Sequence, residues 1–357
     1  DGDKKLVEGT DYTVKYENNT QAGTATIVIT GKGNYTGSVT KQFRIYEPGG
    51  KEKDLFAKSD VVRFAGDTRY DTALNTADAL KKSMGIDKFS YIIVADGNNY
   101  PDALAGSYLA KVKKAPLILV DRSVASEKMI GEYIEKNLSD KGTVYLLGGS
   151  DVVTERFEKS LKGTDVKRLA GDTRYETNLE ILNEAKASKE DLLACTGEGF
   201  ADSLSASAVG KPILLVDNRG LTKAQKTYMD KANVQDIYLI GGADVVSDKV
   251  GKELKSYDKD SKTERIAGDN RYKTSVAVAK AFFPDKCDTA VLAYGMKFPD
   301  GLAGGPLAIS MGSPLLLVED TAYADAKAYG SSVGISRLAV LGGTDVISDA
   351  TAKRILQ

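Results

Sequence analysis

Two arginines and one aspartate recur at fixed spacing in three copies of one octapeptide. The copies read RFAGDTRY at 63–70, RLAGDTRY at 168–175 and RIAGDNRY at 265–272. A guanidinium can pair with a carboxylate or a phosphate through two parallel hydrogen bonds, so the pattern suits either an internal Arg–Asp pair or the binding of anionic groups. Half of the twelve arginines in the chain lie in these motifs, namely Arg63, Arg69, Arg168, Arg174, Arg265 and Arg271.

A second carboxylate recurs at the start of an apolar helical pattern. The stretches read YPDALAGSYLA at 100–110, FADSLSASAVG at 200–210 and FPDGLAGGPLA at 298–308. A carboxylate is favourable at a helix N-terminus, so we expect these aspartates to be N-caps. The three residues are Asp102, Asp202 and Asp300. A third set of aspartates follows the GG pairs, but no nucleophile stands beside a base in any of these motifs.

Composition excludes several classes of function. Histidine is absent, which removes the commonest general base and metal ligand. The two cysteines, Cys195 and Cys287, occupy non-equivalent places in the copies, so neither a repeated metal site nor a repeated disulfide is expected. The formal net charge of −1 argues against a nucleic-acid module. No apolar stretch approaches the roughly 18 residues of a membrane span, and we expect no cofactor, because GGxDV lacks both the GxGxxG spacing and a P-loop lysine.

The octapeptides mark a repeated domain. Their starts are separated by 168 − 63 = 105 and 265 − 168 = 97 residues, which exceeds the period of about 20–50 residues in solenoid repeats and suits small domains. The other blocks recur in the same order in each copy. The sequence therefore predicts three repeats, at 61–165, 166–262 and 263–357.

Each repeat reads as an α/β unit. Continuous apolar runs such as YIIVADG (91–97), APLILVD (115–121) and VYLLGG (144–149) are typical of strands buried on both faces of a parallel sheet. Helical patterns lie between them, and strand–helix alternation predicts a sheet covered by helices. The GG pairs end strands, and Thr154, Ser247 and Ser348 are expected N-caps of the helices that follow.

Residues 1–47 differ in kind. Alternating polar and apolar residues, with turn signals at NNTQAG and GKGNYTG, predict a small antiparallel sheet. The segment looks like the second half of an immunoglobulin-like module, and so few residues of open sheet bury little surface. We therefore expect the sequence to be a fragment of a longer protein, with 48–60 as a Gly-rich and charged linker.

Three ordered copies of these motifs resemble the cell wall binding repeat 2 family over residues 61–357. The resemblance implies that the fold is α/β, with Toprim-like parallel-sheet repeats packed into a pseudo-threefold unit. It also implies a secreted protein, anchored without covalent bonds to an anionic polysaccharide of the Gram-positive wall and often joined to a separate functional module. The prolines of the PLIL-type strands are a family signature that the resemblance links to anchoring, although by themselves they read as core. They are Pro116, Pro212 and Pro314.

Two other functions stay open at this point. One is an enzyme of the Toprim or nucleotide-sugar type, against which the missing histidine weighs. The other is a structural component of a surface layer, whose repeats serve packing and whose partners are other surface proteins. We expect a binding module rather than an enzyme, with the six motif arginines as its best candidates for contact with the polymer. The competing interpretation is that these arginines fix turns or join neighbouring repeats.

Overall fold

The computed structural model describes residues 6–17, 20, 23–45, 54–258 and 262–357. The chain divides into two compact units, Asp1–Lys53 and Asp54–Gln357. In the first unit the described strands form one antiparallel sheet in the order β1-β2-β3, which confirms the predicted antiparallel sheet. An immunoglobulin-like origin stays a prediction. Residues 18, 19, 21 and 22 of the turn NNTQAG and residues 48–53 of the predicted linker lie outside the described residues. The strands are β1 (Tyr12–Glu17), β2 (Gly23–Gly31) and β3 (Ser38–Ile45).

The second unit contains three parallel sheets of four strands each. Their central strands are apolar and buried along their length, as in LILV of β6 and LLACT of β9. The first sheet has β5 (Phe89–Asp96), β6 (Leu117–Val120), β7 (Leu138–Leu147) and β8 (Asp165–Leu169). The second has β9 (Leu192–Thr196), β10 (Ile213–Val216), β11 (Ile237–Ile240) and β12 (Thr263–Ile266). The third has β13 (Thr289–Tyr294), β14 (Leu315–Val318), β15 (Arg337–Leu341) and β4 (Val61–Phe64).

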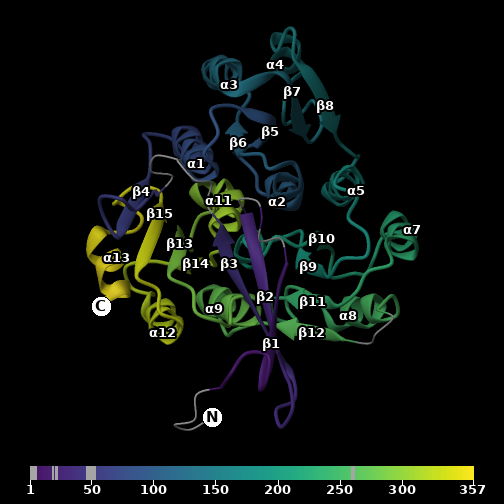
Figure 1. Ribbon diagram of the computed structural model, residues 1–357. Coiled ribbons are helices and arrows are strands. Elements are labelled where there is room, and N and C mark those ends of the chain that lie inside the picture. Colours follow the sequence, from purple (N-terminus) through teal and green to yellow (C-terminus); the bar gives the residue numbers. More distant parts are fainter. Residues whose placement is uncertain (1–5, 18–19, 21–22, 46–53, 259–261) are drawn as a thin grey trace. The chain divides into compact units, whose positions relative to one another are not determined.

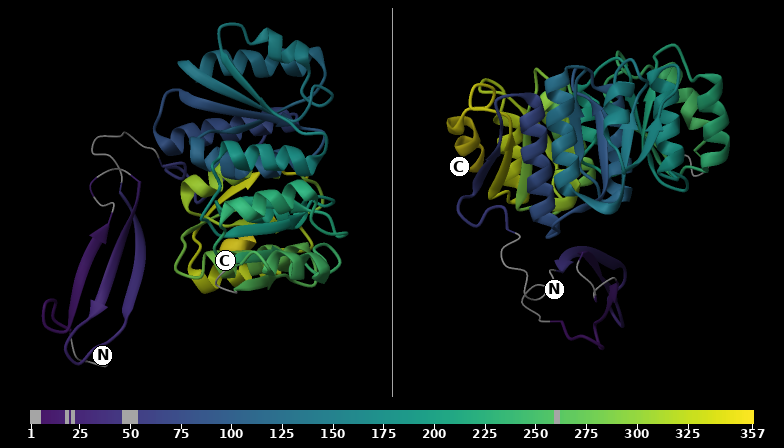
Figure 2. Two further views of the ribbon diagram at one scale, coloured as in Figure 1. Left: turned by 90° about the vertical axis from the view of Figure 1, so that its right-hand side faces the viewer. Right: turned by 90° about the horizontal axis from the view of Figure 1, so that it is seen from above.

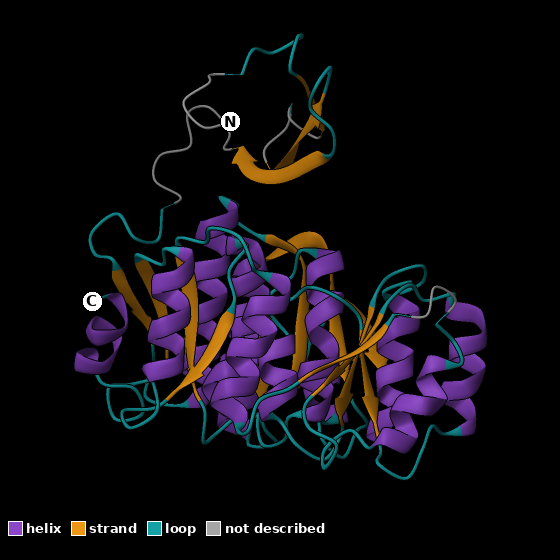
Figure 3. Ribbon diagram, turned by 90° about the horizontal axis from the view of Figure 1, so that it is seen from below, coloured by secondary structure: helices purple, strands orange, loops and turns teal. Residues whose placement is uncertain are grey.

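Helices cover the sheets of this unit (Figure 3). The buried apolar residues form two core clusters, the smaller of which lies in the third repeat. The predicted caps Thr154, Ser247 and Ser348 each accept a hydrogen bond from a backbone amide of the helix that follows. The first repeat has α1 (Arg69–Met84), α2 (Pro101–Lys113), α3 (Val124–Asn137) and α4 (Glu155–Ser160). The second has α5 (Arg174–Glu184), α6 (Ala201–Ala206), α7 (Lys223–Ala232) and α8 (Asp248–Lys255). The third has α9 (Arg271–Phe282), α10 (Pro299–Leu302), α11 (Gly304–Met311), α12 (Ala324–Val333) and α13 (Asp349–Leu356).

The strand that opens each octapeptide belongs to the sheet of a neighbouring repeat. Strand β8 pairs with β7 of the first repeat, and β12 pairs with β11 of the second. The chain then leaves that sheet at the octapeptide glycine and starts the first helix of its own repeat. The first and second sheets therefore each take their fourth strand from the repeat that follows in the sequence.

The same exchange joins the third repeat to the first. Strand β4 pairs in parallel with β15, with Val61 opposite Leu338 and Phe64 opposite Leu341. Figure 1 shows β4, in blue, beside β15, in yellow, although more than 270 residues separate them in the sequence. Three exchanged strands thus close the repeats into a ring.

Helices of successive repeats also pack directly against one another. Helix α2 packs on α5, α6 packs on α9, and α11 packs on α1. Both views of Figure 2 show the three repeats of this unit in contact with one another. The observed architecture confirms the expected fold class, with α/β parallel-sheet repeats and a small all-β segment. Among the described residues, no helix is long and apolar enough to cross a membrane.

Ring closure predicts unequal effects of two truncations. The fragment 54–357 keeps β4 and should unfold at the same denaturant concentration as the second unit of the full chain. The fragment 67–357 loses β4, which leaves one edge of β15 unpaired and removes the charge-assisted bonds of Arg63, each worth roughly 1.5–3 kcal/mol. We expect it to be less stable by at least about 3 kcal/mol, with faster amide exchange in β15. Equal stability of the two fragments in chemical denaturation would show that ring closure contributes nothing.

Candidate functional site

The first arginine of each octapeptide holds the GG turn at the end of the neighbouring strand. Arg63 Nη1 donates to the Gly342 carbonyl at 2.7 Å, and its Nη2 pairs with Asp349 at 2.7 Å. Arg168 and Arg265 repeat the contact with the Gly148 and Gly241 carbonyls, both at 2.8 Å, and pair with Glu158 and Asp248. Only 18–25% of these three side chains is exposed, so most of their donors serve the junction between repeats.

The second arginine of each octapeptide reaches a different strand end. Arg69 and Arg271 each donate through Nη1 at 2.7 Å, to the Gly97 and Gly295 carbonyls, and Arg174 makes the same bond to Gly197. These glycines follow β5, β13 and β9. Within the described part of the chain each of these guanidinium groups makes this one hydrogen bond, although Arg174 also lies near the Glu198 carboxylate and Arg271 lies over the Phe200 ring. The second arginines are therefore the ones with hydrogen-bonding capacity left for a ligand.

The predicted N-cap role of Asp102, Asp202 and Asp300 is wrong. The N-cap positions are the preceding Tyr100, Phe200 and Phe298, and none of these makes a side-chain cap bond. Each aspartate is the second residue of its helix, two positions after the N-cap, and faces the neighbouring repeat instead. Asp202 hydrogen-bonds Thr274, and Asp300 hydrogen-bonds Thr72, both of which are buried threonines at the start of the next repeat's first helix.

The first glycine of each GG pair is required by this aspartate. Its φ lies in the left-handed region, at 97°, 108° and 91°, which favours glycine. A Cβ atom there would lie 2.5–2.6 Å from the Oδ2 of the aspartate in the same repeat, which is closer than two non-bonded heavy atoms approach. The positions are Gly148, Gly241 and Gly342. The GG turn, the aspartate and the octapeptide thus form one interlocked junction, repeated three times.

Two cavities open at these junctions, at the carboxyl ends of the strands. The first has a volume of about 180 Å³ and lies between repeats 1 and 2, where Asp102, Asp151 and Arg174 line it. The second has a volume of about 410 Å³ and lies between repeats 2 and 3, where Asp202 and Arg271 line it. In open parallel sheets the crevice outside the carboxyl ends of the strands is the usual place for a ligand. We call these cavities the first and second clefts.

Both clefts contain more carboxylates than cations. The first cleft has Arg174 with Asp96, Asp102, Asp151 and Asp172. The second has Arg271 with Glu198, Asp202, Asp244 and Asp269. Burial, reinforced by the nearby Asp96, raises the pKa of Asp102 to about 6, and burial also raises the pKa of Asp202. The described residues contain no group of three or more acidic or cysteine side chains placed to hold a metal ion.

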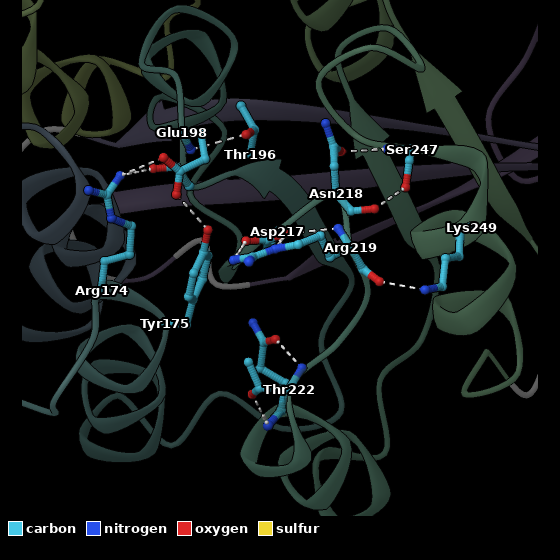
Figure 4. A network of polar contacts seen from close by, with 12 residues as sticks. Arg174, Tyr175, Thr196, Glu198, Asp217, Asn218, Arg219, Thr222, Ser247 and Lys249 are labelled. Carbon is cyan, nitrogen blue, oxygen red and sulfur yellow. Dashed lines mark hydrogen bonds and ion pairs between the residues drawn. The ribbon is translucent and has the colours of Figure 1, made fainter.

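The rim of the clefts is a connected polar surface, shown for the second repeat in Figure 4. Arg174 Nη1 lies 3.6 Å from a carboxylate oxygen of Glu198, and the Tyr175 hydroxyl donates to the same carboxylate at 2.8 Å. The Glu198 amide in turn donates to Thr196 at the end of β9. The last two residues of the octapeptide therefore fix the loop after β9, which leads into the second cleft.

The loops after β10 and β11 continue this rim. Asp217 accepts hydrogen bonds from the guanidinium and the backbone amide of Arg219, which lower the pKa of Asp217 to about 2. Asn218 connects this loop to Ser247 through two bonds of 2.8 Å (Figure 4). The Arg219 side chain is 90% exposed, so the rim presents a cation to solvent next to the more protected clefts.

The three signature prolines lie at the other end of the sheets. Pro116, Pro212 and Pro314 are buried and immediately precede β6, β10 and β14. Their carbonyls accept bonds from the central strands β5, β9 and β13. The clefts and the second arginines lie at the carboxyl ends of the same sheets. A role of the prolines in anchoring stays a prediction, and the structure brings none of them together with the arginines.

An aromatic cluster that the sequence motifs did not predict joins the three repeats. Tyr100, Phe200 and Phe298 are partly buried, and their ring centroids are 6.0, 5.5 and 5.7 Å apart. Because these three distances are nearly equal, the equivalent residues of the three repeats surround a common point. The Arg271 guanidinium lies 5.5 Å from the Phe200 ring centroid. The signal was present in the sequence, because an aromatic residue stands two positions before each recurring aspartate.

Comparisons with known proteins agree with this architecture. A model of the family described as Cell wall binding domain 2 (CWB2) matches residues 63–158, 168–251 and 265–352. Each matched segment starts at the first arginine of an octapeptide. The solved structures Cwp6 and Cwp8 from Clostridium difficile superpose with TM-scores of 0.72 and 0.73, at 19% and 22% identity. Each match covers 96% of this chain, with 58% of the Cwp6 chain and 62% of the Cwp8 chain. At these identities the likeness concerns the fold.

Two curated relatives come from Bacillus subtilis (strain 168). The N-acetylmuramoyl-L-alanine amidase LytC is 25% identical over 310 residues, which cover 84% of this chain and 58% of that protein. The protein named Amidase enhancer is 28% identical over 295 residues, which cover 80% of this chain and 39% of that protein. The chain therefore spans less than two thirds of the length of either relative.

The buried carboxyl of Asp102 predicts a pH-dependent stability difference. Because its pKa is raised in the folded protein, folding becomes less favourable as the pH rises from about 4 through about 6 and the carboxyl ionises. Asp102→Asn removes this loss, so at pH 8 the variant should be more stable by up to about 3 kcal/mol. The difference should vanish near pH 4. Denaturant unfolding at both pH values measures it, with the exposed Asp172→Asn as the control, and a variant that is less stable at pH 8 would contradict the prediction.

Proposed function

Because the chain belongs to the cell wall binding domain 2 family, we propose that it holds a secreted protein on the Gram-positive cell wall by binding an anionic polysaccharide of that wall. Cell wall binding is the function that the family membership supports. The anionic character of the polymer, the secreted location and the contact residues are our proposal. The observation that carries it is the repeated junction, at which the second arginine of each octapeptide holds a strand-end carbonyl, with Arg174 and Arg271 also lining the two clefts.

The two sets of motif arginines have different tasks in this proposal. The sequence motifs predicted all six arginines as candidate contacts with the polymer. The first arginines, Arg63, Arg168 and Arg265, direct most of their donors to turn carbonyls and carboxylates of the junction. The second arginines keep donors beside the strand ends, so we assign the contact with anionic groups to Arg69, Arg174 and Arg271. The cleft interiors are acidic, and for this reason the anionic groups lie along the rim.

Repetition supplies the affinity that a single rim contact lacks. The net charge of −1 provides no general attraction to an anionic wall. Three equivalent arginines on one rigid ring can engage successive charges of one polymer, and linked weak contacts gain avidity without new chemistry. Other surface proteins are a second class of partner in this proposal. They contact other parts of the longer protein that such an anchor carries.

A binding role without catalysis fits the site better than wall hydrolysis. The relatives' names include an amidase, but this chain matches only 58% of that protein. The clefts combine carboxylates, an arginine and backbone groups, and the chain has no histidine. We assign the attachment function to this chain and place any wall-cleaving activity of such proteins outside it.

The division between the two sets of arginines predicts unequal triple variants. Replacing Arg69, Arg174 and Arg271 together by Gln should keep the fold, because each loses one backbone contact, and should weaken binding to purified walls of the producing bacterium more than tenfold. The matched set Arg63→Gln, Arg168→Gln and Arg265→Gln should instead lower thermal stability. Wall binding of the folded protein should also decrease with salt, because exposed ion pairs are screened over about 10 Å at 0.1 M. Normal binding by the first triple variant would move the contact surface elsewhere.

The non-catalytic assignment is tested separately. Incubation of the purified chain with purified walls should release neither reducing sugars nor free amino groups above the level of a heat-unfolded sample. Release that grows in proportion to the concentration of the chain would contradict the assignment.

A further inference from the structure

The clefts are built from the same motifs but are not equivalent. Three residues before the recurring aspartate, the first repeat has Asn99, the second has Gly199 and the third has Lys297. Asn99 lines the first cleft, which is the smaller one, and Gly199 lines the second. The second repeat also has Ala201 where the others have proline. Ligand pockets usually have volumes of about 300–1,000 Å³, and of the two clefts only the second, at about 410 Å³, reaches that range.

All three repeats contribute to the second cleft. Tyr100 comes from the first repeat, Phe200 from the second and Arg271 from the third. Tyr100 and Phe200 belong to the aromatic cluster, with their rings tilted by 56° to each other. The Arg271 guanidinium lies over the Phe200 ring and also donates to the Gly295 carbonyl. The second cleft therefore has an aromatic wall and a fixed donor, whereas no aromatic residue is among those that line the first cleft.

The polar groups of the second cleft are mostly acceptors. Glu198, Asp202 and Asp244 lie in it with one arginine. A phosphate or carboxylate placed inside would meet more negative than positive charge. A ligand that brings hydroxyl donors together with an apolar face suits the cleft better, because hydroxyls donate to carboxylates and C–H groups pack against aromatic rings. A pyranose ring has both features.

We propose that the second cleft is a subsite for one pyranose ring of a wall glycan, walled by Tyr100 and Phe200 and hydrogen-bonded by Asp202 and Asp244. This inference rests on the proposed wall-binding function and adds the part of the ligand that is not charged. In this arrangement the anionic groups lie on the rim at the second arginines, and the uncharged ring enters the cleft. The affinity of the anchor then depends on sugar structure as well as on charge.

The residue difference between the clefts provides a matched pair of variants. Gly199→Asn places in the second cleft the side chain that the first cleft has. A Cβ at Gly199 would meet only Thr196 Cγ2, at 3.4 Å, so the backbone accommodates it. The control Gly199→Ala adds only the Cβ at the same position and leaves out the amide group. Circular dichroism and thermal unfolding of both variants establish that the fold is retained.

The experiment measures binding of the wild-type chain and both variants to purified walls of the producing bacterium. Each wall preparation is used intact and after acid extraction of its secondary polymer. We expect Gly199→Asn to bind at least tenfold more weakly and Gly199→Ala to bind like the wild type. The loss should persist at 0.3 M salt, because ring packing and hydroxyl bonds are not screened. Binding that disappears with the extracted polymer assigns the ring to that polymer, and binding that survives assigns it to peptidoglycan.

Failure of this inference differs from failure of the proposed function. A wild-type chain that binds neither wall preparation would refute wall binding itself. A wild-type chain that binds, with Gly199→Asn binding equally well, would refute the pyranose subsite and leave the rim contacts standing. A loss caused by Gly199→Asn that vanishes at 0.3 M salt would show that the cleft holds a charged group, which also overturns the subsite.

Discussion

The pairing of β4 with β15 is the contact on which the arrangement of the large unit depends. Two exchanged strands, β8 and β12, join the repeats in order, but only the third exchange returns the chain to its start. With the ring closed, each junction is held by a strand, an arginine and a helix pair. Parts of the octapeptide of one repeat and the GG turn of another thus come to share one cleft. The clefts are a product of the junctions between repeats, since no single repeat contains all the residues that line one.

The octapeptide is best understood as a connector that serves two sheets. Its strand and first arginine belong to the sheet behind it, and its second arginine and tyrosine fix the strand end of the sheet ahead. One segment therefore sets the distance between two sheets. The aspartates that lie against the GG glycines are Asp102, Asp202 and Asp300. Burial raises the pKa of each of them. A carboxyl kept where burial disfavours its charge is the kind of local conflict that marks functional sites.

Much of this structure follows from the sequence, and the part that does not has a physical reason. The buried strands, the caps at Thr154, Ser247 and Ser348, and the helix that starts after each octapeptide glycine are local properties, and their patterns predicted them. The sheet that β8 joins could not be predicted, because a short edge strand has the same pattern in either neighbouring sheet. Asp102 was predicted to be an N-cap because an aspartate near the start of a helix usually has that role. The residues of a helix's first turn do not reveal that the side chain faces another repeat. The difference between the two clefts depends on Gly199. Its role could not be predicted from the sequence, because Tyr100, which lines the same cleft, belongs to another repeat.

The central claim is that wall glycan binds at the carboxyl ends of the sheets, in and around the junctions between repeats. Amide hydrogen exchange of the full chain, with and without soluble fragments of the wall polymer, tests it most directly. We predict slower exchange on binding in 168–177, 196–204 and 241–246 and in the octapeptide at 265–272, with no change near Pro116, Pro212 and Pro314. Protection confined to the proline ends of the sheets, or to the outer helices, would contradict the account.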